Sequence, residues 1–139
     1  MTRRTKILFA STAVLVIFLV AGYAAWRSVM SPAANLKHAL QIKKVPESVR
    51  NLRMGRDILP DDVSCFSFTI SPADFNQLLV GRRFRCKTSS IPEEFVTVHL
   101  SPPEAVSGRV SYNWRTNDAS CAVFTDDTRQ RVIVFFAAD

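Results

Sequence analysis

The sequence has few of the residues from which most catalytic and metal sites are built. It contains 2 histidines, 3 cysteines and 4 glycines in 139 residues. So few glycines leave no glycine-rich phosphate loop, and no two cysteines have the spacing of a metal site. Neither His38 nor His99 has a serine, cysteine or carboxylate at a spacing known from catalytic sites. We therefore expect no enzymatic activity, no cofactor and no metal.

The positive charge of the chain is concentrated near its N-terminus. The formal net charge is +6, but the part from Val45 onward holds 11 Lys and Arg against 12 Asp and Glu. A domain that binds nucleic acid is expected to carry its own basic surface. The uneven distribution therefore argues against a nucleic-acid partner.

A long apolar run dominates the first part of the chain. Residues 7–26 form 20 consecutive residues without a charge, preceded by Arg3, Arg4 and Lys6 and followed by Arg27. A helix of this length spans roughly 30 Å, the thickness of the hydrocarbon core of a bilayer. We predict a transmembrane signal-anchor helix over residues 7–27, with the lipid bilayer as its partner.

A cleaved signal peptide is an alternative interpretation of the same run. The basic start and the small residues near its end are typical of such peptides, but 20 residues exceed the usual apolar region of about 7–15. A twin-arginine signal is a further alternative, although Lys6 stands where that motif prefers an apolar residue.

Basic residues before the run predict its orientation. Short basic segments next to a membrane span usually remain in the cytoplasm. We expect residues 1–6 to form a cytoplasmic tail and the C-terminal domain to be extracytoplasmic, at the cell membrane.

Residues 28–45 are predicted to be a juxtamembrane linker or a short helix. Ser31 and Pro32 suit the N-cap and first positions of a helix, and Leu36, Ala39 and Leu40 recur at helical spacing. A flexible stalk is the alternative, and the basic residues of a helix would favour anionic lipid headgroups.

Residues 46–139 are predicted to form an α+β domain. Five or six short strands are expected, around Val49–Met54, at Val63–Ser71, Phe95–Leu100, Arg109–Arg115, Cys121–Thr125 and Arg131–Phe136. The turn at Asp126–Arg129 indicates a hairpin and favours a small antiparallel sheet. Ser71-Pro72 and Gly81 predict one short helix over residues 72–80, packed on that sheet and ended by a left-handed glycine.

Three cysteines allow one disulfide at most within the chain. Cys86 and Cys121 lie near the ends of predicted segments, where geometry is adjustable, so they form the candidate pair. Cys65 lies within a strand, which favours a buried thiol. A domain without any bridge is the alternative.

The most distinctive surface candidate is a basic stretch that follows the predicted helix. The candidate binding residues are Arg82, Arg83, Phe84, Arg85 and Lys87. Arginines offer paired donors to phosphate or carboxylate groups, and the phenylalanine offers an apolar anchor. The alternative is that these cations only balance the negative end of the helix dipole.

One pattern is similar to that of small, anchored bacterial proteins of unknown function. It runs through Val45-Pro46-Glu47-Ser48-Val49, Phe66-Ser67-Phe68 and Ser71-Pro72-Ala73-Asp74-Phe75. The similarity carries no catalytic signature, and it implies a bacterial envelope location.

Taken with the composition, the sequence predicts a membrane-anchored extracytoplasmic accessory or binding domain that acts by contact. Its expected partner is an envelope or membrane protein. Two alternatives remain open. One is a structural subunit of a membrane complex, and the other is a small hydrolase whose site residues converge from distant positions.

Overall fold

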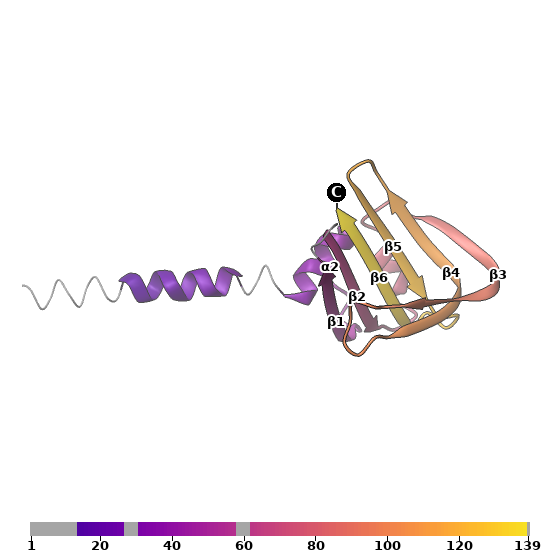
Figure 1. Ribbon diagram of the computed structural model, residues 1–139, viewed down its shortest axis with the longest axis horizontal. Coiled ribbons are helices and arrows are strands. Elements are labelled where there is room, and N and C mark those ends of the chain that lie inside the picture. Colours follow the sequence, from indigo (N-terminus) through magenta and orange to yellow (C-terminus); the bar gives the residue numbers. More distant parts are fainter. Residues whose placement is uncertain (1–13, 27–30, 58–61, 139) are drawn as a thin grey trace, which may run out of the picture.

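The computed structural model describes residues 14–26, 31–57 and 62–138 (Figure 1). Residues 14–26 form a helix on the N-terminal side of a folded domain. The elements of the domain are α2 (Pro32–Leu40), β1 (Arg50–Asp57), β2 (Asp62–Thr69), the 3-10 helix η1 (Phe75–Leu79), β3 (Arg85–Val96), β4 (Ala105–Arg115), β5 (Ala119–Thr125) and β6 (Arg131–Ala138).

The six strands form one antiparallel sheet in the order β1-β2-β6-β5-β4-β3. The last strand, β6, lies between β2 and β5, so the C-terminal segment joins the first hairpin to the later strands (Figure 1). The predicted α+β class and antiparallel sheet are confirmed. The turn at Asp126–Arg129 is also confirmed, since the Asp126 carboxylate accepts hydrogen bonds from the backbone of Gln130 and Arg131.

Helix α2 belongs to the folded domain rather than to a linker. The Ser31 hydroxyl accepts a hydrogen bond from the backbone N–H of Ala34 at 3.1 Å, which caps the helix as the sequence predicts. Leu36, Ala39 and Leu40 are buried against the sheet. Helix α2 therefore shares the core of the sheet, which the sequence assigned to residues 46–139.

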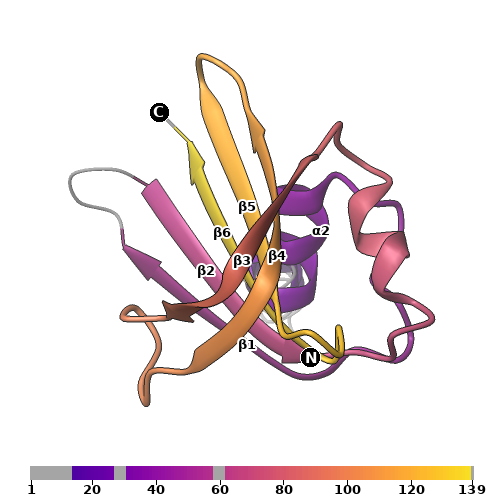
Figure 2. The same ribbon diagram turned by 90° about the vertical axis from the view of Figure 1, so that its right-hand side faces the viewer.

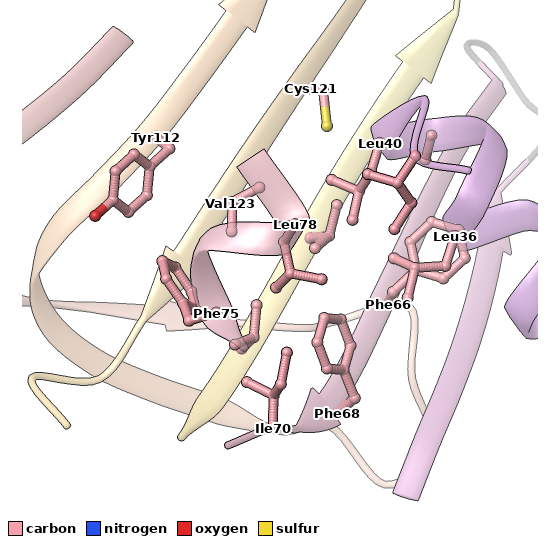
Figure 3. Close-up of a cluster of buried hydrophobic side chains, with 14 residues drawn as sticks. Leu36, Leu40, Phe66, Phe68, Ile70, Phe75, Leu78, Tyr112, Cys121 and Val123 are labelled. Atoms are coloured by element: carbon pink, nitrogen blue, oxygen red, sulfur yellow. The ribbon is translucent and has the colours of Figure 1, made fainter. Parts of the chain in front are cut away.

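The main core lies between the sheet and the layer formed by α2 and η1 (Figure 3). Leu36 and Leu40 of α2 and Phe75 and Leu78 of η1 meet alternate side chains of the central strands. Those strand residues are Phe66, Phe68, Cys121, Val123, Val132 and Val134. The period-2 alternation of these strands is what places one row of side chains in this core.

The predicted helix over residues 72–80 is wrong in extent and type. The structure has a single 3-10 turn, and Asp74 makes no side-chain cap. Its carboxylate accepts a hydrogen bond from the Ser48 hydroxyl at 2.6 Å instead, which draws it away from the backbone. Gly81 does not have positive φ, and a Cβ there would lie 2.2 Å from the carbonyl oxygen of Leu40. The glycine is needed for close approach to α2, not for a left-handed cap.

Strand β3 begins ten residues before the predicted Phe95–Leu100 strand. Its first four residues, Arg85–Thr88, are exposed on both faces, so they lack the apolar alternation by which a strand is predicted. The register with β4 then shifts between Thr88 and Glu93.

The second face of the sheet is partly covered by the β3–β4 hairpin. The sheet is strongly curved, and the tip of this hairpin reaches toward β1 (Figure 2). Cys65, Val106 and Ile133 form a small apolar cluster there, and the ring of Phe95 stacks on Phe124 with centroids 3.6 Å apart. Gly108 permits the bend in β4, because a Cβ at this position would lie 1.9 Å from the Thr125 carbonyl oxygen.

Glu104 fastens this hairpin to the first two strands. Its carboxylate accepts hydrogen bonds from Arg53 at 2.5 Å and from the Ser67 hydroxyl, and Arg53 also donates to the Pro102 carbonyl at 2.9 Å. Three segments that are distant in the sequence are thereby joined by one half-buried carboxylate.

Among the described residues, no helix is both long enough and apolar enough to cross a membrane. The predicted span, residues 7–27, lies partly outside the described residues, which include only its portion from 14 to 26.

We expect Glu104→Gln to lower the free energy of unfolding by about 1–3 kcal/mol, because the neutral amide loses two charge-assisted hydrogen bonds. The hydrogen bond from Ser67, followed by the effect of Arg53, holds the pKa of Glu104 below its ordinary value of 4.5. A carboxyl with a lowered pKa stabilises fully above that ordinary value and loses its contribution as pH falls through the lowered pKa.

Thermal unfolding of the full-length chain in detergent, followed by circular dichroism from about pH 7 to about pH 2, measures this effect. The difference between wild type and variant should shrink in acid. Glu94→Gln, at an exposed carboxylate of β3, is the control and should change little. A Glu104→Gln deficit that stayed constant over the whole range would contradict the assignment.

Candidate functional site

The structure divides the predicted basic stretch into residues with different surroundings. Arg82 is buried, with 8% of its surface exposed, whereas Arg83, Arg85 and Lys87 are exposed. Phe84 is half-buried and packs against the main core. The five candidate residues therefore do not form one continuous surface.

Arg82 completes the C-terminal end of α2. Two of the last carbonyls of the helix, those of Lys37 and His38, accept backbone hydrogen bonds from Ile42 and Gln41. The Arg82 guanidinium donates to the next carbonyl, that of Ala39, at 2.6 Å. Cations are favoured at this end of a helix by its dipole. The alternative that the sequence left open thus holds for Arg82, although the helix is α2 rather than the one predicted at 72–80.

The same guanidinium lies over an aromatic ring. Its central carbon is 3.8 Å from the centroid of Trp114, and Phe136 is further away at 5.4 Å. Burial lowers the pKa of Arg82, but an arginine remains a cation inside proteins. Among the described residues no carboxylate pairs with it, so the helix carbonyls and the ring face compensate its charge.

The exposed arginines border a groove at the end of the sheet. We call it the arginine groove, with a volume of about 830 Å³. It is lined by Arg83, Phe84, Arg85, Asn113, Trp114, Arg115, Thr116 and Asn117. No carboxylate is among the lining residues, and none of the three guanidinium groups has an ion-pair partner among the described residues. The groove combines unpaired cations with an aromatic wall.

Strand register explains how the groove is assembled. Arg85 of β3 lies opposite Asn113 of β4, so the residues before Arg85 approach those after Asn113. Trp114 connects two environments, because it packs against the core and also lines the groove. Lys87 lies outside the groove, and its ammonium is 3.4 Å from the Glu93 carboxylate.

Arg115 was not among the candidate residues from the sequence. Trp114 alternates with Val110 and Tyr112, a pattern that could line a binding groove but favours the core, and in the structure it does both. Arg115 and Trp114 are about 30 positions from Arg85, and only the antiparallel pairing of β3 with β4 brings them together. The available sequence signal was the basic residue at the end of an alternating strand, followed by the polar turn Thr116–Asp118.

The predicted disulfide between Cys86 and Cys121 is wrong, because both are free thiols. Cys86 is opposite Tyr112 on β4, and Tyr112 is opposite Val123 on β5, so the two cysteines are two strands apart. Two strand spacings are about 10 Å, beyond the reach of a disulfide. Cys65 and Cys121 are buried, and burial raises the pKa of each thiol to about 12.

The described residues contain no group of three or more His, Cys, Asp and Glu side chains arranged to hold a metal ion. What the groove offers is arginine donors, amide groups and an aromatic face, which are suited to binding an anionic group by contact. Comparison with protein-family models, with curated proteins and with solved structures finds no match for this chain.

We expect truncation of Arg82 to destabilise the domain and truncation of Arg83 to have little effect. Arg82→Ala should lower the free energy of unfolding by about 2–4 kcal/mol, because it leaves a helix carbonyl without its donor and uncovers Trp114. Arg83→Ala, at an exposed position, should stay within about 0.5 kcal/mol of wild type. Chemical denaturation of the full-length chain in detergent measures both.

Arg82→Lys separates the contribution of the positive charge from that of the planar guanidinium group. It keeps the charge but loses the planar group that both donates and stacks, so it should recover only part of the loss. Equal stabilities of Arg82→Ala and Arg83→Ala would refute the structural role of Arg82.

Proposed function

We propose that this chain is a membrane-anchored, extracytoplasmic binding domain that recognises an acidic partner through the arginine groove. The observation that carries the proposal is that Arg83, Arg85 and Arg115 line one groove together with Trp114, without a carboxylate in the lining. Guanidinium groups bind carboxylates through paired hydrogen bonds, and a tryptophan face supplies apolar contact.

Two observations support the proposed membrane anchor: the apolar run itself and the exposure of its side chains. Residues 14–26 are helical, and their large apolar side chains are 50–72% exposed. Such a row of exposed side chains is unfavourable in water, and a bilayer would bury it. The basic residues before the run favour a cytoplasmic N-terminus and a domain outside the cytoplasm.

Binding of an acidic probe tests the groove. Fluorescein-labelled polyglutamate should bind the full-length chain in nanodiscs of neutral lipid, with an affinity that falls as salt is added. The variant Arg83→Gln/Arg85→Gln/Arg115→Gln should bind at least about tenfold more weakly, since each charged hydrogen bond is worth about 1.5–3 kcal/mol. Fluorescence anisotropy is the measurement.

Arg109→Gln is the matched control, because Arg109 lies on the same strand as Arg115 but outside the groove. It should bind as wild type does. If the triple variant bound polyglutamate as tightly as the control, the groove would not be the site.

Native Cys86 tests the location of the domain without an added cysteine. It is exposed, whereas Cys65 and Cys121 are buried with raised pKa values, so a maleimide should react at Cys86 alone. In intact cells a membrane-impermeant maleimide should label the full-length, membrane-bound chain, and Cys86→Ser should remain unlabelled. Labelling that required cell lysis would place the domain in the cytoplasm.

A further inference from the structure

Strand β3 leaves one edge of the sheet unpaired beside the arginine groove. It is the last strand in the sheet order, so only its β4 side is hydrogen-bonded. Residues Arg85–Thr88 keep a regular register with β4 and are exposed. Beyond them the register shift and Pro92, which has no N–H, interrupt the edge. The regular open edge is therefore the short segment Arg85–Thr88, whose first residue lines the groove.

The side chains of this segment place basic groups on one face. Arg85 and Lys87 lie opposite Asn113 and Ser111, and residues directly opposite in an antiparallel pair share a face of the sheet. Arg115 follows Asn113 by two positions on β4 and so belongs to the same face.

The opposite face of the same segment is uncharged. Cys86 and Thr88 lie opposite Tyr112 and Val110, whose side chains belong to the core face. Along this edge, positive and uncharged positions alternate with the period of a strand.

We propose that β3 accepts an acidic segment of a partner protein as an added strand, with acidic residues at every second position. This inference rests on the proposed function and specifies the class of partner. The backbone of the segment would bond to the open edge at Arg85–Thr88, as in other cases of strand addition. Its alternate side chains would then face Arg85 and Lys87, where opposite charges on neighbouring strands attract.

The charges around the open edge favour an acidic added strand. Arg85 has no carboxylate partner among the described residues, and Lys87 has only Glu93, at the long distance of 3.4 Å. Arg83 and Arg115 line the groove at the start of β3, so an acidic residue beyond the added strand would still meet guanidinium groups.

Two isomeric peptides distinguish strand addition from simple charge attraction. Both alternate glutamate and threonine over eight residues and carry fluorescein. One is N-methylated at the glutamate amides and the other at the threonine amides. Because successive amides of a strand point to opposite edges, only one isomer would block the edge that faces β3. With the full-length chain in neutral-lipid nanodiscs, one isomer should bind like the unmethylated peptide and the other at least about tenfold more weakly.

Hydrogen exchange gives a second readout. The unmethylated peptide should slow exchange of the backbone amides at residues 85–88, which contact by side chains alone would not do. The charge-reversed variant Arg85→Glu/Lys87→Glu should prefer a lysine–threonine peptide of the same pattern. Arg109→Gln again serves as the control.

The outcomes separate the two proposals. Equal binding of both methylated isomers, with no protection at residues 85–88, would overturn strand addition while leaving the groove as a site for acidic partners. Failure of all these peptides and of polyglutamate to bind would overturn both proposals. Unequal binding with protection supports the added strand.

Discussion

The domain depends on the burial of one cation, Arg82, at the end of α2. A buried charge is costly unless polar groups compensate it, and here the compensation comes from helix carbonyls and the face of Trp114. The contact ties α2 to the segment between η1 and β3 and to the end of β4. Gly81, which approaches Leu40 too closely for any side chain, lies directly before it. Together they fix where the chain emerges to start β3.

That fixed point decides which basic residues are buried and which remain exposed. Arg82 is committed to α2, so the next residues of the chain turn outward beside β4. Arg83 and Arg85 then line the same groove as Arg115 and Trp114, whose other contacts are structural. Trp114 also packs against the core and under Arg82, so it connects the wall of the groove to the core.

The curvature of the sheet gives the two ends of β3 different surroundings. At the end of β3, the hairpin that joins it to β4 folds toward β1 and is held there by Glu104, Arg53 and Ser67. The start of β3 lies away from this closure and keeps its outer edge open. The later part of β3 is protected by Pro92 and a shifted register, as edge strands often are. The unprotected part is thus short and begins at the arginine groove.

Local patterns in the sequence determined the parts of this protein that depend on short-range physics. The N-cap at Ser31, the alternation of β2 and of Arg109–Arg115, and the aspartate turn at Asp126–Arg129 all follow from hydrogen bonds or periodicity within a few residues. The apolar run that predicts an anchor is likewise visible in the sequence alone.

Only the tertiary structure decided which basic residues are buried and which remain free. Arg82 and Arg83 are indistinguishable neighbours in the sequence. Arg82 is buried and Arg83 is exposed, because α2, some 40 positions earlier, offers the Ala39 carbonyl to Arg82. The helix at 72–80 shortened because Ser48 binds Asp74, and the disulfide is absent because β4 separates the two strands that carry its cysteines. In each case a contact between distant segments outweighs a local preference of similar or smaller energy.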